Sequence, residues 1–166
     1  MSRPIATITV VGAGPLGREL AGRAIQAGYR TLLEDLSGEW RRRFGDDPAL
    51  TGVEWERDLA RAASQADLIL EAAPDDFETK FEVYTLLDRA AAPSCLFAST
   101  SPAWPVAEIA SFTYRAPLVV GVWSGKLVRG PETSDLAAEA VARVLERLDP
   151  WNGTISFCND RTASGS

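Results

Sequence analysis

The chain has 166 residues, of which 46% are apolar and 24% are charged, and its formal net charge is −6. This length and composition fit one globular domain with a buried core. The negative charge and the lack of a basic stripe argue against a nucleic-acid partner. The sequence contains no histidine, which excludes a histidine general base, a Ser-His-Asp triad and a histidine-containing zinc site. We therefore expect no metal site.

No apolar run approaches the roughly 18 residues that a membrane-spanning helix needs. Residues 1–4 lead directly into the first predicted strand without a signal-peptide pattern. These features predict a cytoplasmic protein that has no membrane partner. Cys95 and Cys158 lie in strand-like runs, where buried free thiols are expected rather than a disulfide.

A glycine-rich turn follows the first apolar run, at residues 8–11. The run opens into Gly-x-Gly-x-x-Gly and then into a helical pattern, which is the order found in a βαβ dinucleotide-binding unit. Gly12 permits the tight turn, Gly14 lets a pyrophosphate approach, and Gly17 lets the helix pack on the sheet. Pro15 suits the first helical turn. A pyrophosphate would then lie at the positive end of the helix dipole.

The second predicted strand, residues 29–33, ends in two acidic residues about 20 positions beyond the glycines. We expect Asp35 to accept hydrogen bonds from the adenosine ribose and to repel a 2′-phosphate, which favours NAD over NADP. The basic run at residues 41–43 could instead reach a 2′-phosphate, although such a run is usually a solvated helix face. A glycine-rich turn that binds nothing is the remaining alternative.

Strands and helices alternate along the rest of the chain. Strands are expected at residues 53–55, 66–73, 95–98, 118–123 and 154–158, and helices at residues 36–44, 59–64, 77–87, 106–110 and 136–148. Phe77, Phe81, Tyr84 and Leu87 are predicted to form the buried stripe of their helix, and residues 124–131 a loop. The alternation predicts an α/β fold with a doubly wound parallel sheet of the Rossmann type. Residues 1–160 would form a single dinucleotide-binding domain and residues 161–166 a polar tail.

Further motifs follow in a recognisable order: an apolar strand at residues 66–73, Pro-Asp-Asp and a lysine, Ser-Thr-Ser at residues 99–101, Glu-Ile-Ala at 108–110 and Val-Gly at 120–121. With these motifs the chain resembles the NAD-binding domain of the 3-hydroxyacyl-CoA dehydrogenase family, from about residue 8 to about residue 160. The resemblance implies NAD as the cofactor, held by Gly12, Gly14, Pro15, Leu16, Gly17, Asp35, Ala73, Asp75 and Lys80.

The same resemblance places Ser101 beside the nicotinamide and the substrate oxygen. Each of these assignments has a plainer alternative. Asp75 could be only a helix cap, Lys80 a solvated lysine, and Ser101 a turn former before Pro102.

The chain also departs from the family pattern. Trp123 stands where the family has its catalytic histidine, and Ser99 where it has an asparagine. The segment that carries the glutamate orienting that histidine is shortened, and the sequence ends where the family continues into a helical domain. Other groups would then carry the proton: Ser99 and Ser101 through water, or Lys126, which is close enough in sequence to face the same cleft.

Three functions remain compatible with these residues. The first is an atypical NAD-dependent oxidoreductase that acts on a small or carrier-bound hydroxyacyl or ketoacyl substrate. The second is a non-redox enzyme, such as a dehydratase or cyclase, that reuses the cleft. The third is a catalytically inactive module that senses NAD or binds a partner. We favour the first, because no other catalytic set is present. A homodimer or a partner protein in place of the helical domain is expected, since its absence should expose apolar surface.

Overall fold

A computed structural model describes residues 3–149 and 155–160. Its strands are β1 (Thr7–Val11), β2 (Arg30–Glu34), β3 (Glu54–Glu56), β4 (Leu68–Glu71), β5 (Leu96–Ser99), β6 (Val119–Trp123), β7 (Lys126–Arg129) and β8 (Ser156–Asn159). Its α-helices are α1 (Pro15–Gln26), α2 (Glu39–Phe44), α3 (Leu59–Ser64), α4 (Phe77–Ala90), α5 (Val106–Ser111) and α6 (Asp135–Leu148). The predicted tail, residues 161–166, lies outside the described residues.

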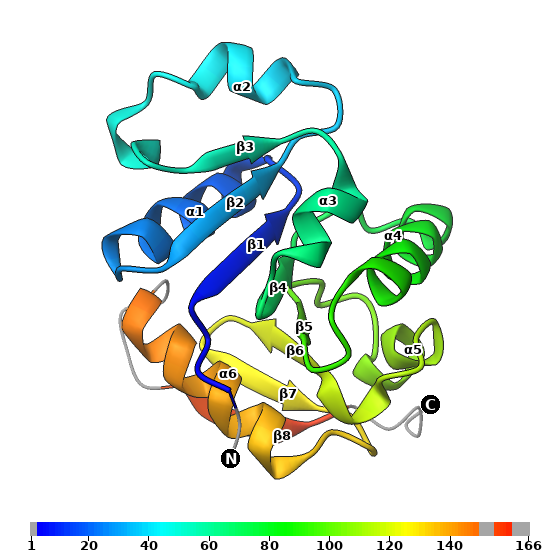
Figure 1. The fold of residues 1–166 in the computed structure, drawn as a ribbon. Coiled ribbons are helices and arrows are strands. Elements are labelled where there is room, and N and C mark those ends of the chain that lie inside the picture. Colours follow the sequence, from blue (N-terminus) through cyan, green and yellow to red (C-terminus); the bar gives the residue numbers. More distant parts are fainter. Residues whose placement is uncertain (1–2, 150–154, 161–166) are drawn as a thin grey trace.

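All eight strands belong to one sheet, in the order β3-β2-β1-β4-β5-β6-β7-β8 (Figure 1). The first six are parallel, β7 runs antiparallel to β6, and β8 runs parallel to β7. The predicted α/β fold with a doubly wound, mostly parallel sheet is therefore confirmed. The order reverses between β1 and β4, and ligands of such sheets bind outside the strand ends at this switch point.

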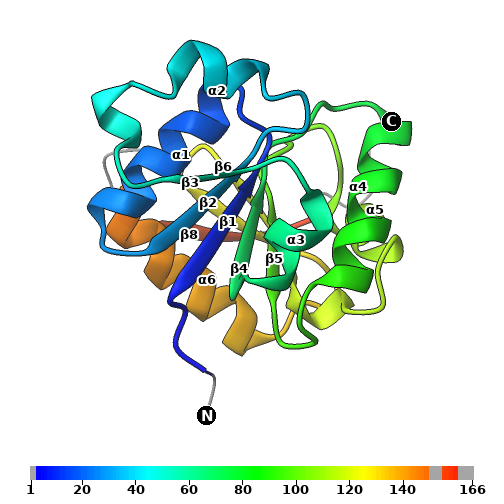
Figure 2. The ribbon, with the colours of Figure 1, turned by 45° about the horizontal axis from the view of Figure 1, so that its top comes forward.

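Helices cover both faces of the sheet, with α1 and α6 on one side and α3, α4 and α5 on the other (Figures 1 and 2). Successive residues of a strand point to opposite faces. Accordingly, Val10 and Leu70 belong to the core under α1 and α6, whereas Val11 and Ile69 belong to the core under α3 to α5. Burial on both faces explains why β1 and β4 are almost continuously apolar.

The buried stripe of α4 differs from the prediction. Phe77 and Phe81 are 53% and 46% exposed, whereas the helix buries Lys80, Tyr84 and Leu87. Lys80 and Tyr84 bond to a carboxylate inside the domain, and this contact turns the phenylalanines outward. The predicted burial of Phe77 and Phe81 is therefore wrong. The prediction used hydrophobicity alone, and it did not consider that Glu71 inside the domain would bind polar groups of the helix.

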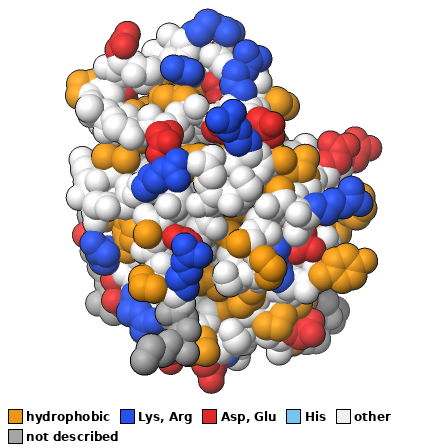
Figure 3. Space-filling view, in the orientation of Figure 1, with side chains coloured by type: hydrophobic (Ala, Val, Ile, Leu, Met, Phe, Trp, Pro, Cys, Tyr) orange, Lys and Arg blue, Asp and Glu red, His pale blue; other side chains and the backbone are white. Residues whose placement is uncertain are grey.

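The surface in the view of Figure 3 carries basic side chains over α2 and patches of apolar side chains elsewhere. Phe77 and Phe81 stack on each other, and both make edge contacts with Phe112.

Among the described residues, no helix is long and apolar enough to cross a membrane.

The segment predicted as a loop, residues 124–131, instead contains β7. Ser124 and Gly125 both have positive φ angles, 48° and 74°, and such two-residue turns match the twist of antiparallel strands. Trp123 pairs with Lys126 across this turn. The hairpin therefore brings both residues to the edge of the sheet at which β6 ends.

Candidate functional site

The three glycines of the turn after β1 have different surroundings. Gly12 has a φ of +97°, and a Cβ there would lie 2.6 Å from the Ala72 carbonyl oxygen. A Cβ on Gly17 would lie 1.7 Å from the Gly12 carbonyl oxygen. A Cβ on Gly14 would meet nothing within 4 Å. Gly12 and Gly17 therefore close the turn against backbone, whereas Gly14 faces open space.

Helix α1 begins at this open space. Its N-cap is Gly14, no side chain caps it, and Pro15 occupies the first turn. The first amides of a helix have no partner within the helix and lie at the positive end of its dipole. Leu16 is partly exposed there. This end of α1 therefore offers donors to an anion beside Gly14, and the predicted pyrophosphate contact stays a prediction.

Two hollows meet at the glycine turn. The wide hollow has a volume of about 950 Å³ and extends past the end of β2 to α3 and α4. The narrow hollow, of about 480 Å³, extends past the end of β4 to Asp75, Thr100 and Pro102. The residues that line both are Gly12, Ala13, Trp40, Ala73 and Pro74. An elongated ligand with a central anionic group fits this arrangement, with one end in each hollow.

Two carboxylates end β2 beside the wide hollow. Asp35 is only 4% exposed, and its oxygens accept hydrogen bonds from the Ser37 hydroxyl and the Arg41 amide. Glu34 is 9% exposed, and its Oε2 accepts the Gly12 amide at 3.2 Å. Glu34 thus reaches the glycine turn itself, a contact that the sequence analysis missed because it followed the family motif to Asp35. The predicted ribose contact of Asp35 stays a prediction, and Glu34 joins it as a candidate.

Burial raises the pKa of Glu34, an effect that hydrogen bonds from the Gly12 and Leu36 amides partly offset. The folded state therefore binds this proton more tightly than the unfolded state, and the free energy of unfolding falls as pH rises through this range. We expect Glu34→Gln to gain stability relative to the wild type as pH rises from about 4 towards neutrality. Urea unfolding at several pH values measures this, and a difference that stays constant with pH would contradict it.

Trp40 was not predicted as a site residue, yet it lines both hollows. The Arg18 guanidinium lies 4.9 Å from the centroid of its ring and 3.7 Å from that of Phe44. Arg18 also donates to the Ala13 carbonyl at 2.8 Å. Helix α2 is thereby attached to the glycine turn through one arginine. No sequence motif indicated this contact, because the partners lie on different helices.

Lys80, predicted to reach the cofactor, lines neither hollow. It is fully buried, and its ammonium lies 2.6 Å from Glu71 Oε2, 2.9 Å from the Ala73 carbonyl and 3.3 Å from Asp75 Oδ1. The first two contacts are hydrogen bonds and the third is an ion pair. Ala73 and Asp75 do line the narrow hollow. The contact of Lys80 with a dinucleotide stays a prediction. In the structure the Lys80 ammonium contacts Ala73 and Asp75, the two residues that face the hollow.

The two predicted catalytic serines occupy different depths. Ser99 is buried and donates to Glu71 Oε1 at 3.2 Å. Ser101 donates to Asp75 Oδ1 at 2.5 Å, and its neighbours Thr100 and Pro102 line the narrow hollow. Ser101 is 9% exposed and does not itself line the hollow, but of the two serines it is the one whose neighbours do.

Trp123 and Lys126 lie on the hairpin beyond these serines. A Cβ on Gly121 would lie 2.9 Å from Val106 of α5, and Trp123, two residues further along β6, points to the same face. Trp123 is 42% exposed, and Lys126 is also exposed. Neither lines the wide or the narrow hollow. The catalytic role of Lys126 stays a prediction.

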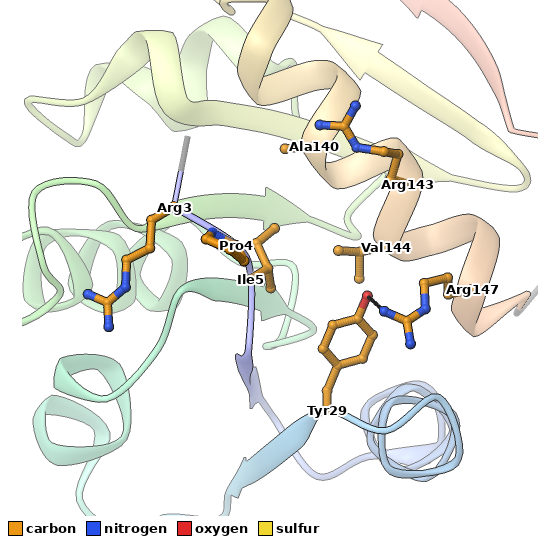
Figure 4. Close-up of a pocket in the computed structure, with 8 residues that line it drawn as sticks. All are labelled: Arg3, Pro4, Ile5, Tyr29, Ala140, Arg143, Val144 and Arg147. Atoms are coloured by element: carbon orange, nitrogen blue, oxygen red, sulfur yellow. Dashed lines mark hydrogen bonds between the residues drawn. The ribbon is translucent and has the colours of Figure 1, made fainter. Parts of the chain in front are cut away.

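A separate hollow of about 250 Å³ lies beside the start of β2 and along α6 (Figure 4). There Arg147 donates to the Tyr29 hydroxyl at 3.0 Å, and Figure 4 shows Arg3 and Arg143 extending away from that ring. Tyr29 immediately precedes β2, so this hollow lies at the amino ends of the strands. It is therefore at the edge of the sheet opposite the glycine turn.

The parallel sheet, the glycine turn at its switch point and the hollows on either side define a Rossmann-type dinucleotide-binding domain. A sequence profile of the family described as "3-hydroxyacyl-CoA dehydrogenase, NAD binding domain" matches residues 43–123. Over these residues the chain is similar to the NAD-binding domain of the 3-hydroxyacyl-CoA dehydrogenase family.

Individual relatives agree with this assignment. A probable 3-hydroxybutyryl-CoA dehydrogenase of Bacillus subtilis is 26% identical over 173 residues, which cover 87% of this chain and 60% of that protein. Two solved structures share the fold: a diketoreductase (TM-score 0.82, 20% identity, 95% of this chain and 64% of that one) and the 3-hydroxybutyryl-CoA dehydrogenase of Escherichia coli (TM-score 0.79, 22% identity, 95% and 39%). The chain spans between 36% and 63% of the length of the curated relatives it matches.

Proposed function

We propose that this chain is an NAD(H)-dependent oxidoreductase that acts on a hydroxyacyl or ketoacyl substrate, either a small molecule or a carrier-bound acyl group. The observation that carries the proposal is the open space at Gly14, which lines the narrow hollow beside the uncapped start of α1. The relatives support the chemistry, since their names describe 3-hydroxybutyryl-CoA dehydrogenases and a diketoreductase.

The residues present fit a dinucleotide. The α1 amides and Gly14 would hold the pyrophosphate, and Glu34 or Asp35 the adenosine ribose in the wide hollow. Ala73 and Asp75 would line the nicotinamide end in the narrow hollow. NAD supplies the hydride acceptor or donor. The chain itself then has to bind and orient the substrate, exclude water and exchange one proton.

A second candidate function is an NAD-binding module without turnover. The observation that favours it is Trp123, which stands where the resemblance places a histidine and which cannot exchange a proton. General acid–base groups typically contribute about 10²- to 10⁴-fold to a rate. A chain that keeps the cofactor site without any such group would bind NAD and react very slowly.

Cofactor binding is tested by titrating NADH against the tryptophan fluorescence, because Trp40 lines both hollows. We expect saturable quenching in the wild type and its loss in Gly14→Val, whose side chain fills the proposed pyrophosphate position without meeting protein atoms at Cβ. Weaker binding in Asp35→Asn or in Glu34→Gln identifies which carboxylate holds the ribose. Equal quenching by NADH in the wild type and Gly14→Val would contradict the site.

Turnover separates the two candidate functions. Oxidation of NADH with an acetoacetyl thioester, absent in Gly14→Val, supports the oxidoreductase. Saturable NADH binding without turnover of this thioester or of 3-hydroxybutyryl-CoA supports the binding module instead.

A further inference from the structure

Asp75, Lys80, Glu71, Ser99 and Ser101 are joined at the narrow hollow by hydrogen bonds and one ion pair into a closed circuit, which we call the polar ring. Ser101 donates to Asp75 at 2.5 Å, and Lys80 lies 3.3 Å from the same carboxylate oxygen. Lys80 also donates to Glu71 at 2.6 Å, and Ser99 donates to Glu71 at 3.2 Å. The Ser101 amide completes the ring by donating to Ser99 Oγ at 3.3 Å.

The inner half of the polar ring is fixed. Glu71 is fully buried and accepts additional hydrogen bonds from the Tyr84 hydroxyl and the Ala73 amide, both at 2.7 Å. Burial, and then the Glu71 carboxylate, raise the pKa of Tyr84 well above its usual value, so this hydroxyl stays a donor. Lys80 is held by its hydrogen bonds to Glu71 and the Ala73 carbonyl and by its ion pair with Asp75. Asp75, which lines the narrow hollow, is therefore the member of the ring that a ligand meets directly.

In the outer half of the ring, Asp75 lines the narrow hollow, and Ser101 lies between two residues that line it. The Asp75 side chain is 53% exposed and lines this hollow. The hydroxyl proton of Ser101 is used in its bond to Asp75, which leaves the lone pairs of Ser101 Oγ to accept a hydrogen bond. A substrate hydroxyl placed in the hollow beside Thr100 could therefore donate to Ser101 Oγ. The Ser101 hydroxyl itself already donates to Asp75.

We propose that Asp75 is the final acceptor of the substrate proton, which it receives through Ser101. This inference rests on the proposed oxidoreductase function. As the hydride leaves the carbinol carbon for the cofactor, the substrate O–H bond breaks, its electron pair forms the C=O bond, and its proton passes to Ser101 Oγ. Ser101 gives its own proton to the Asp75 carboxylate. Reduction of a ketone runs through the same atoms in reverse.

The other candidate proton carriers are less well placed. The sequence contains no histidine. Ser99 is 3% exposed, against 9% for Ser101. Lys126 lies on the hairpin between β6 and β7, and neither it nor its sequence neighbours line either hollow, whereas both neighbours of Ser101 line the narrow one. Glu34 lies at the wide hollow, away from Thr100 and Pro102. Lys80 and Glu71 act in this scheme as positioning residues, because they hold the Asp75 carboxylate from behind.

The contact between Ser101 and Asp75 is tested first without cofactor. In protein labelled with ¹³C at the aspartate carboxyl groups, the Asp75 signal is the one that Asp75→Asn removes. We expect Ser101→Ala to shift this signal and Ser111→Ala to leave it unchanged, since the Ser111 hydroxyl donates to the Glu108 carbonyl and not to Asp75. If the ¹³C chemical shift of the Asp75 carboxyl group is the same in the wild type and in Ser101→Ala, the proposal is overturned.

The proton step is then measured with 3-hydroxybutyryl-CoA and NAD. We expect Asp75→Asn and Ser101→Ala each to lower kcat about 100-fold, as loss of a general base does, with the KM for NAD changed less than threefold. Asp75→Glu should restore part of kcat. Oxidation by the wild type should be slower in D₂O than in H₂O, and Asp75→Asn should lose this difference.

The matched control is Asp76→Asn. Asp76 is the neighbouring acid, but it caps α4 through the Thr79 amide, and asparagine caps equally well. This variant should keep the wild-type kcat. An equal loss in Asp76→Asn and Asp75→Asn, or wild-type kcat in Asp75→Asn, would overturn the proton role of Asp75 while saturable NADH quenching still supports the cofactor site. Absence of NADH quenching would overturn the proposed function, and the proton role with it.

Discussion

Gly17→Ala is expected to destabilise the domain more than any other single methyl group added to the glycine turn. The added Cβ would lie 1.7 Å from the Gly12 carbonyl oxygen and 2.9 Å from its carbon. Both atoms are backbone, so no side-chain rotation relieves the overlap. Either α1 moves away from β1 or the turn opens. We expect a loss of at least about 3 kcal/mol in the free energy of unfolding, at the upper end of what overpacking costs.

Gly14→Ala is the matched control for this prediction. It adds the same methyl group three residues earlier, where nothing lies within 4 Å. Its free energy of unfolding should stay within about 0.5 kcal/mol of the wild type, as for a surface substitution. Urea unfolding followed by far-UV circular dichroism measures both variants. Equal stability of Gly17→Ala and Gly14→Ala would mean that the close packing of α1 on β1 is not as described.

Lys80→Met is expected to lower the free energy of unfolding by about 3–5 kcal/mol, because it leaves the Glu71 carboxylate buried without its cationic partner. Both side chains are 1% exposed, and their charged atoms lie 2.6 Å apart. Taking a lone carboxylate out of water is costly. The hydrogen bonds from Tyr84 and the Ala73 amide remain, but they do not neutralise the charge.

The double variant Glu71→Gln, Lys80→Met separates charge from packing. It removes both charges and keeps an acceptor for Tyr84, so we expect it to recover most of the lost stability. An exposed ion pair provides the control: Arg30 and Glu54 lie 2.7 Å apart with nearly half of each side chain exposed. Arg30→Met should therefore cost at most about 1 kcal/mol. Equal losses from Lys80→Met and Arg30→Met in urea unfolding would contradict the buried character of the Glu71–Lys80 pair.

These two predictions concern the two sides of the narrow hollow. The glycine turn forms one wall, and the polar ring stands behind the other. At Gly17 the helix packs directly on backbone atoms of the turn, which leaves no room for a side chain. At Lys80 the buried ammonium is paired with the buried Glu71 carboxylate. Gly14 and Asp75 both line the hollow between these two features.

Local sequence was sufficient to predict the fold and the glycine turn. The spacing of Gly12, Gly14 and Gly17 after an apolar strand is a backbone requirement, which any sequence must meet to turn from β1 into α1 in this way. Continuous apolar runs in β1 and β4 predict strands that are covered on both faces. Periodicity also located most helices and strands, because each depends on its own residues and their spacing.

Tertiary structure decided what periodicity could not. Whether Phe77 or Lys80 faces inward depends on Glu71, nine residues before Lys80 on another element. The hairpin at Ser124 depends on a pairing partner in β6. Glu34 and Asp35 are adjacent acids at one strand end, and only the packed turn brings Glu34 to the Gly12 amide.

The sequence by itself determined a Rossmann-type domain with a glycine cradle, because turn geometry and strand burial are encoded within a few consecutive residues. Only the tertiary structure decided that Lys80 turns inward and that Ser101 bonds to Asp75. These contacts join β4, β5 and α4. Their existence depends on how a buried charge finds its partners when the helix packs on the sheet, which no local pattern records.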